Sequence, residues 1–211
     1  MFTVKAVIHL AHTTGALIVG EGVEDIEDAV CLINAGADML QGYLFAKPSL
    51  PHDIQENEIN LKIVEVVDRF KTERITEYTK KKSTVEIYNT ILKNFTEKLG
   101  TARITEFNTI LRMLLKGFPE VECAYIIGEN GIQISDTAFK SQDSCNSLFR
   151  PDSKGADQSF KDYFFYIKAG QKFFVSNPYI SAATGEICIT ISARFLDFHR
   201  SSHILCIDMM S

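Results

Sequence analysis

The sequence predicts an α+β protein, in which an antiparallel sheet is preceded by long helices and by a small fragment of parallel α/β structure. Three observations support this fold class. Residues 187–194 alternate between apolar and polar side chains, as a strand does. Apolar residues recur at spacings of three and four through much of residues 51–118, and residues 1–50 alternate between helical and strand patterns. The length of the chain, 211 residues, is enough for one or two domains.

The N-terminal zone is predicted to follow the order helix, strand, helix, strand. Apolar positions at helical spacing indicate a first helix over residues 4–11. The apolar run at 16–19 is typical of a strand that is buried on both faces. A second helical stripe covers residues 26–33 and is ended by Gly36, and a second short strand follows at 39–43. Two strands alone cannot close a barrel, so this zone is expected to be a fragment of a larger fold.

The middle zone is predicted to be helical almost throughout. Pro51 suits the first turn of a helix. The apolar stripe weakens before Ser83, and Ser83 with Glu86 fits a capping box, so a fresh helix is predicted to start there. Gly100 is a plausible C-cap, and Thr101 is then the predicted N-cap of a third helix.

The C-terminal zone is predicted to contain the antiparallel sheet. An Asn-Gly pair at 130–131 lies between two apolar runs, which is a strong β-hairpin signal. The polar segment 136–158 indicates a loop, and the aromatic segment 160–168 indicates a short helix. Strands are predicted at 173–180 and 203–210, on either side of the alternating strand in the sequence.

Composition and charge exclude several classes of protein. The chain has 22 basic and 27 acidic residues and a net charge of −5, which argues against a nucleic-acid binder. Its longest apolar runs fall far below the ~18 residues of a membrane helix, and the N-terminus lacks the pattern of a secretory signal. The cysteines are odd in number, widely spaced and without a CxxC motif, so buried reduced thiols in a cytoplasmic protein are expected. They are Cys31, Cys123, Cys145, Cys188 and Cys206.

Residues 16–48 contain a pair of motifs, Glu-Gly-Val-Glu from Glu21 to Glu24 and Gln-Gly-Tyr starting at Gln41. This segment resembles the C-terminal end of an EAL domain, the barrel of bacterial cyclic-di-GMP phosphodiesterases. The resemblance implies metal-assisted hydrolysis, with Mg²⁺ or Mn²⁺ held by carboxylates in an intact domain. It assigns Glu21 and Glu24 to a catalytic loop and Gln41 to the lining of the active site.

The chain lacks most of the groups that this resemblance requires. The Glu-Ala-Leu motif, the paired Asp and the other metal ligands that the family carries on earlier strands have no counterpart here, and Gly20 replaces the usual Ala. One carboxylate loop cannot hold two cations. We therefore expect no cofactor, no hydrolysis by this chain alone, and cyclic-di-GMP binding only in an intact EAL domain. The chain is expected to be either a piece of a longer protein or a truncated gene product.

Residues 84–211 contain a second set of motifs, in the order of an aromatic helix, a strand, a Thr-Gly turn, a second strand and a closing Asp. The segments are Tyr163–Gly170, Val175–Ser181, Thr184–Ser192 and Cys206–Asp208. They resemble the EAL-associated sensor domain of the YkuI C-terminal type, which is akin to Cache and PAS-like sensors. The resemblance implies a small-molecule pocket between the sheet and the helix and loop that lie over it.

Five side chains are the candidate ligand-binding residues. Tyr163, Tyr166 and Tyr179 offer flat apolar surfaces with hydroxyl tips. Arg194 can pair bidentately with a carboxylate, and Asp208 can receive an ammonium group. Together they predict an amino-acid-like or small organic-acid ligand. Each also has a purely structural interpretation: the tyrosines as core residues, Arg194 as a surface charge and Asp208 as a hydrogen-bond acceptor.

The combined prediction divides the chain into an EAL fragment at 1–50, a helical linker at 51–83 and a PAS- and Cache-like sensor domain at 84–211. The predicted function is signal transduction in a bacterial cyclic-di-GMP protein. The sensor would bind a small molecule and relay that event through the linker helices without being catalytic itself. We expect a cytoplasmic homodimer with no nucleic-acid or membrane partner.

Two alternatives remain open. The chain could belong to an active cyclic-di-GMP phosphodiesterase, which a turnover assay with magnesium or manganese would reveal. It could instead be a dimerisation scaffold without a ligand, in which case the core around Tyr163, Tyr179 and Arg194 would contain no cavity.

Overall fold

The computed structural model describes residues 2–140, 152–181 and 185–210. It confirms the predicted α+β class, with helices and a mainly antiparallel sheet. The chain forms two compact units, Met1–Ser83 and Thr84–Ser211. The boundary between them lies inside one continuous helix. The division into an EAL fragment, a linker and a sensor domain stays a prediction.

The first unit follows the predicted order of helix, strand, helix and strand. Its strands pair in parallel, with Val19 opposite Met39. Pro51 opens a short 3-10 turn, as its fixed backbone angle favours, and the long helix begins after it. The elements are α1 (Phe2–Thr13), β1 (Val19–Gly20), α2 (Ile26–Ala35), β2 (Met39–Leu40), η1 (Pro51–Asp53) and the first part of α3 (Glu56–Gly100).

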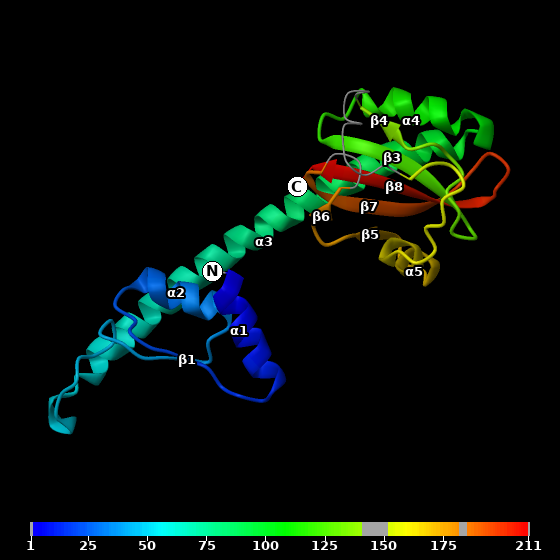
Figure 1. Ribbon diagram of the computed structural model, residues 1–211. Helices are drawn as coiled ribbons and strands as arrows, with labels where there is room; N and C mark the ends of the chain where they lie inside the picture. The colour runs from blue at the N-terminus through cyan, green and yellow to red at the C-terminus, as the bar shows by residue number, and fades with distance from the viewer. Residues whose placement is uncertain (1, 141–151, 182–184, 211) are drawn as a thin grey trace. The chain divides into compact units, whose positions relative to one another are not determined.

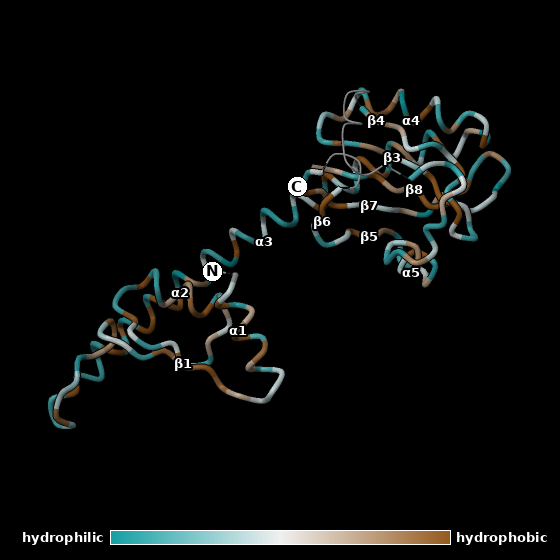
Figure 2. The backbone as a smooth tube through the Cα atoms, viewed as in Figure 1, coloured by the Kyte–Doolittle hydropathy of each residue, from teal (hydrophilic) through white to brown (hydrophobic). Residues whose placement is uncertain are grey.

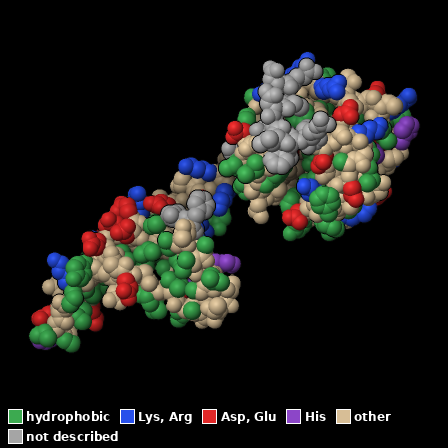
Figure 3. Space-filling model, in the orientation of Figure 1, with side chains coloured by type: hydrophobic (Ala, Val, Ile, Leu, Met, Phe, Trp, Pro, Cys, Tyr) green, Lys and Arg blue, Asp and Glu red, His purple; other side chains and the backbone are tan. Residues whose placement is uncertain are grey.

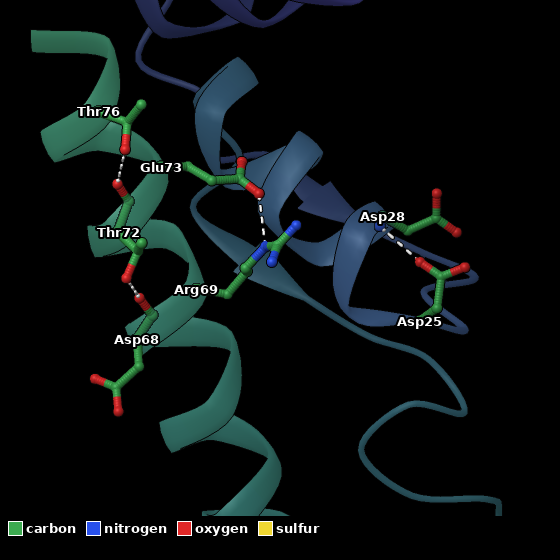
Figure 4. A network of polar contacts seen from close by, with 7 residues as sticks. All are labelled: Asp25, Asp28, Asp68, Arg69, Thr72, Glu73 and Thr76. Atoms are coloured by element: carbon green, nitrogen blue, oxygen red, sulfur yellow. Dashed lines mark hydrogen bonds and ion pairs between the residues drawn. The ribbon is translucent and has the colours of Figure 1, made fainter.

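Helix α2 is delimited by two strong caps. The side chain of Asp25 accepts a hydrogen bond of 2.8 Å from the backbone N–H of Asp28, as Figure 4 shows. Gly36 ends the helix with a φ of 104°, which only glycine adopts freely, and its N–H bonds to the last carbonyls. The inner face of α2 packs against α3 within the first unit. This small core contains Val23, Ala29, Val30 and Val66.

The prediction that residues 16–19 form a strand buried on both faces is wrong. The strand is limited to Val19 and Gly20, and Leu17 and Val19 are 70% and 43% exposed. Within the described part of this unit, β1 pairs only with β2, so no larger sheet surrounds it. The apolar run at residues 16–19 is therefore hydrophobic enough for a buried strand in a larger sheet, although most of it is exposed here.

The prediction of a fresh helix at Ser83 is also wrong, because α3 runs unbroken from Glu56 to Gly100. The hydroxyl of Ser83 donates to the carbonyl of Thr79, four residues earlier, and does not act as a cap. The segment contains no Pro, and no Gly before its last residue, so nothing in it breaks the helix. Figure 4 shows similar bonds from Thr72 and Thr76, with an ion pair of 2.8 Å between Arg69 and Glu73.

The second unit contains an antiparallel sheet whose strand order is β4-β3-β8-β7-β5, with β6 also paired to β7. The long central pairs are β3 with β8 and β7 with β8 (Figure 1). The elements are the end of α3, η2 (Ile104–Glu106), α4 (Phe107–Leu115), β3 (Val121–Gly128), β4 (Ala138–Phe139), α5 (Asp162–Lys168), β5 (Phe173–Val175), β6 (Tyr179–Ile180), β7 (Ile187–Leu196) and β8 (Ser202–Met210).

Helices cover the two faces of this sheet unequally. The end of α3 and all of α4 pack on one face, where they form the larger core with Ile126, Ile191 and Ile207. Helix α5 packs on part of the other face, against Tyr125 and Cys206. The central strands therefore show as largely hydrophobic segments in Figure 2. The rest of this second face is not covered by α5.

Several local predictions for the second unit need correction. The strand predicted at 173–180 is two short strands, because Pro178 has no N–H for the ladder. Thr101 bonds to the carbonyl of Lys98 and is no N-cap, and α4 starts only at Phe107. The alternating strand is buried at most positions of both faces, because one face packs into the larger core and Thr190 on the other face bonds to Asp208 and Tyr179. The predicted hairpin turn at 128–131 is confirmed, although its second arm forms only bridges.

The cysteines are placed mostly as predicted. Cys123, Cys188 and Cys206 are buried and free of disulfides, but Cys31 is exposed on α2. Cys145 and Thr184, which belong to the sequence predictions, lie outside the described residues. Among the helices of the described segments, none is both long enough and apolar enough to cross a lipid bilayer.

Candidate functional site

Backbone hydrogen bonds bring the two EAL-like motifs together. The N–H of Val23 donates to the carbonyl of Gln41 at 3.1 Å, and the N–H of Gln41 donates to the carbonyl of Gly20 at 2.8 Å. The loops approach so closely that a Cβ atom at position 42 would lie 2.0 Å from the carbonyl oxygen of Val23. Only Gly42 fits there, which explains the glycine in the second motif.

The side chains of this site do not fit a divalent-cation centre. Glu21, Glu24 and Gln41 are all exposed. Within the described residues, no group of three or more His, Cys, Asp or Glu side chains is arranged to hold a metal ion. A two-metal phosphodiesterase site needs several such carboxylates. The catalytic assignment of these three residues therefore stays a prediction from resemblance, and no hydrolytic step follows from their geometry.

A cavity of about 650 Å³ lies in the second unit, on the face of the sheet that α5 leaves partly open. Its size is within the range of pockets that bind small molecules. Four of the five predicted ligand residues line it, namely Tyr163, Tyr166, Tyr179 and Asp208. The other lining residues are Cys123, Tyr125, Gln133, Thr137, Asp152, Gln158, Lys161, Asp162, Phe174, Val175, Ser176, Asn177, Pro178, Ser181 and Thr190.

Asp208 is the most deeply buried charged group of the cavity, at 7% exposure. It comes from β8 and accepts hydrogen bonds from Thr190 Oγ1 at 2.8 Å and from Cys123 Sγ at 3.4 Å. Because the Thr190 hydroxyl gives its proton to Asp208, the Tyr179 hydroxyl, 2.7 Å from Thr190, is the donor to Thr190. Burial raises the pKa of Asp208 to about 6, and its hydrogen bonds oppose this effect only in part, because they lower the pKa.

A second polar network lines the cavity toward the loops. The hydroxyl of Tyr125 donates to that of Tyr163, and Tyr163 donates to Gln158 Oε1, both at 3.0 Å. The amide of Gln158 donates to the carboxylate of Asp152 at 2.9 Å and to Gln133 at 3.2 Å. Burial raises the pKa of both phenols, so the tyrosines contribute neutral hydroxyls.

An aromatic pair completes the lining. The rings of Tyr166 on α5 and Phe174 on β5 are stacked, with centroids 4.6 Å apart and an interplanar angle of 12°. Tyr166 is 45% exposed, so this pair lies between the cavity and solvent. Such rings offer apolar surface and favourable contacts to cations.

The structure does not bring Arg194 to this cavity. Its side chain is exposed, donates to Ser202 Oγ at 2.7 Å and lies 3.8 Å from Glu129. Arg194 is on the same strand as Thr190 and shares its face, since the two are four residues apart. That separation is roughly 13 Å along the strand, so the side chain lies well beyond the buried carboxylate.

Sequence reasoning missed most of the polar lining. Thr190 belonged to the polar half of the alternating strand and could have been chosen on that basis. Asp152 and Gln158 come from a segment that was predicted to be a loop, and Gln133 comes from the second arm of the predicted hairpin; nothing in their pattern distinguishes them from surface residues. The burial of Gln133 and Gln158 depends on contacts between segments that are distant in the sequence.

Comparisons with known proteins agree with the two resemblances found in the sequence. Residues 2–48 match the model of the EAL domain family, which confirms the predicted EAL fragment. The Bacillus subtilis YkuI protein, solved with an EAL domain and in complex with its substrate c-di-GMP and calcium, is similar over 100% of this chain, with 20% identity and a TM-score of 0.67. The chain spans about half, 53%, of the length of that protein. At this identity the likeness shows the fold.

Chemoreceptor domains are also among the similar solved structures. The ligand-binding domain of Pseudomonas fluorescens CtaA, in complex with L-isoleucine, has 17% identity and a TM-score of 0.48, over 70% of this chain and 58% of that one. The ligand-binding domain of Campylobacter jejuni Tlp3, in complex with L-valine, has 18% identity and a TM-score of 0.46, over 61% of this chain and 54% of that one. No curated protein matches the sequence significantly.

Proposed function

We propose that this chain is a regulatory module of a cyclic-di-GMP signalling protein, and that its second unit binds a small molecule. The EAL match at residues 2–48 supports the signalling context. The cavity of about 650 Å³, with Asp208 buried among hydrogen-bond donors at its inner end, is the observation that carries the binding function. A core filled only for stability would leave no such space beside a carboxylate.

The chemistry of the cavity favours a ligand that carries an ammonium group. Asp208 accepts its protein hydrogen bonds from neutral donors, Thr190 and Cys123, so a cationic ligand would supply the missing opposite charge. An organic acid would bring a second negative charge to a buried carboxylate, which is unfavourable. Of the two ligand classes expected from the sequence, the amine-bearing class is therefore the one proposed.

Signal relay is the second part of the proposal. The end of α3 belongs to the core of the second unit, through Ile91, Phe95 and Leu99, and the same helix contributes Val66 to the core of the first unit. A ligand that changes the packing of the sheet would bias the position of α3. Assembly as a cytoplasmic homodimer is proposed on the sequence alone.

The site argues against both alternatives, for different reasons. The cavity argues against a scaffold with a filled sheet, which predicts no space near Tyr163 and Tyr179. The donor set of the first unit does not fit the metal centre that an active phosphodiesterase requires. Neither alternative is supported by a specific observation in the described residues.

Thermal unfolding against a library of amines, amino acids and organic acids tests the binding function. We expect at least one amine-bearing compound to raise the Tm of the whole chain. Asp208→Asn should weaken its affinity by about 10-fold to 100-fold, since a charge-assisted bond is lost. Arg194→Gln is the matched control and should bind normally, because Arg194 lies outside the cavity. Failure of every compound to bind would contradict the proposal.

A further inference from the structure

A carboxylate and two hydroxyl groups form a continuous hydrogen-bonded chain at the inner end of the cavity. Asp208 Oδ1 lies 2.8 Å from Thr190 Oγ1, which lies 2.7 Å from the hydroxyl oxygen of Tyr179. These distances are those of well-formed O–H···O hydrogen bonds. The three residues come from neighbouring strands, since β7 pairs with both β8 and β6. The chain therefore links the buried carboxylate to a tyrosine that is 38% exposed.

The backbone holds Thr190 at the centre of this chain. Thr190 is directly opposite Asp208 in the β7–β8 ladder, so the two side chains share one face of the sheet. Its backbone N–H donates to Ser176 Oγ at 2.8 Å, and its carbonyl accepts from the N–H of Ser176 at 2.9 Å. Thr190 has no exposed surface. Its hydroxyl is therefore fixed between one hydrogen-bond partner on each side.

The groups that face Asp208 most closely include no cation. Cys123 Sγ lies 3.4 Å from the second carboxylate oxygen, and Glu122, the preceding residue of β3, adds a nearby negative charge. Hydrogen bonds from Thr190, Cys123 and Tyr179 lower the pKa of Asp208. Among the ion pairs of residues 2–140, 152–181 and 185–210, none involves Asp208. The charge of this acid is therefore supported only by neutral donors.

The remaining titratable groups near Asp208 are neutral. Its charge raises the pKa of two further thiols and two phenols, namely Cys188, Cys206, Tyr125 and Tyr163. The other charged residues that line the cavity, Asp152, Lys161 and Asp162, make their recorded polar contacts elsewhere than at Asp208. Burial raises the pKa of Asp208 itself to about 6. Both of its protonation states are therefore populated in mildly acidic solution.

The chain accommodates both protonation states of Asp208 with its heavy atoms in the same places. When Asp208 is ionised, Tyr179 donates to Thr190 and Thr190 donates to Asp208. When Asp208 gains a proton, the carboxylic acid donates to Thr190 Oγ1, and the Thr190 hydroxyl rotates to donate to Tyr179. This reversal needs no movement because a hydroxyl group both donates and accepts, whereas the thiol of Cys123 is a weak acceptor for the new proton.

An ammonium group requires the first of these two states. A protonated carboxyl group has lost its charge and offers fewer acceptor sites. We infer that Thr190 is a positioning residue that makes amine binding by Asp208 proton-dependent, because its chain to Tyr179 supports the ionised carboxylate and reverses when a proton takes the place of the ammonium. This inference rests on the proposed binding function and deepens it, since it names how the same site is regulated. Acidification releases a bound amine.

Isothermal titration calorimetry on the full chain tests this inference with two primary amines, 1-aminobutane and 2-phenylethylamine. Both stay protonated in the range used, as lysine does, so any proton released on binding comes from the protein. For the tighter-binding amine, we expect the affinity to fall about tenfold from about pH 7.5 to about pH 5, through competition with one proton. Near pH 6, binding should release about half a proton, which buffers of different ionisation enthalpy reveal.

Variants of Thr190 test the role of the hydroxyl group. Because the hydrogen bond from Thr190 lowers the pKa of Asp208, Thr190→Val should weaken amine binding about threefold or more at about pH 6.5, and the affinity should recover by about pH 9. Thr190→Ser keeps the hydroxyl and should restore the wild-type pH profile. Ser192→Ala is the matched control, since it removes a buried hydroxyl from the same face of β7, outside the cavity. It should leave the profile unchanged.

The outcomes separate this inference from the binding function. An amine affinity that is independent of pH between about 5 and about 7.5, or binding near pH 6 without proton release, would overturn the inference and leave amine binding intact. So would a Thr190→Val profile equal to that of the wild type, or a Thr190→Ser profile equal to that of Thr190→Val. Proton release is measured on the wild-type chain, so it decides even if Thr190→Val does not fold.

Failure of both amines to bind at about pH 7.5 would also sink the inference. The binding function would then stand if another small molecule raised the Tm of the chain in an Asp208-dependent way. It would fall if no compound did so.

Discussion

The two units of the chain differ in how completely they bury their apolar residues. The core of Met1–Ser83 consists of four buried side chains from a loop, α2 and α3, with partly buried neighbours. Exposed apolar side chains such as Leu10, Leu17 and Leu61, at 66%, 70% and 70%, surround it, and Figure 3 shows hydrophobic groups gathered on its surface. The unit of Thr84–Ser211 instead has buried clusters on both faces of its sheet.

This difference indicates that the two units have different physical roles. Hydrophobic stabilisation scales with the apolar area removed from water, so the second unit holds most of the stability of the chain. It also contains the cavity of about 650 Å³. The first unit matches the EAL family model over residues 2–48 but has few packing partners and no group of three or more metal-ligating side chains among its described residues.

The largest expected effect is the loss of stability from a core truncation in the second unit. Leu205 is fully buried in β8, and Leu205→Ala should lower the free energy of unfolding by about 2–5 kcal/mol. Leu61→Ala, at an exposed position of the first unit, should change it by less than about 0.5 kcal/mol. Urea unfolding followed by circular dichroism measures both. Similar losses for the two variants would break the comparison.

The second prediction concerns the pH dependence that Asp208 confers on the second unit. Its pKa is about 6 in the folded chain, against an ordinary value of 3.8. The shift is upward, so the contribution to stability is present below the ordinary pKa and is lost as the pH rises through about 6. We expect a decline of about 2 kcal/mol in the wild type relative to Asp208→Asn, measured by urea unfolding from about pH 4 to about pH 7. A difference between the two proteins that is independent of pH would refute this assignment.

A smaller effect is expected from Gly42→Ala in the first unit. The added Cβ would meet the backbone of Val23 at 2.0 Å, so the two motif loops must separate. We expect a destabilisation of about 1–3 kcal/mol that is limited to this unit. Hydrogen exchange should accelerate in peptides covering residues 18–45 and stay unchanged in peptides from β7 and β8. Gly155→Ala, a glycine with nothing within 4 Å of its would-be Cβ but a φ of +95°, controls for backbone strain alone.

The candidate site was predictable where it depended on strand position and residue type. Tyr163 and Asp208 could be assigned to the cavity because an aromatic helix and a late strand acid suggested a pocket between helix and sheet. Arg194 could not be excluded from the sequence, because it lies on the same face of β7 as Thr190. Only its position near the far end of that strand places its side chain beyond the cavity. Gln158 could not be found, because its burial depends on a hydrogen bond to Gln133, 25 residues earlier in the sequence.

Local patterns by themselves determined the α+β class and the order of the elements in the first unit. These follow from side-chain periodicity, which needs no knowledge of distant contacts. The assignment of the EAL motifs at Glu21 and Gln41 and the shortage of metal ligands followed from the resemblance to that family. Tertiary structure alone decided that α3 continues through Ser83, that Leu17 is exposed and that a carboxylate at position 208 lies inside a cavity. Such outcomes depend on which surfaces are covered, and burial is a property of the packed chain that no local pattern contains.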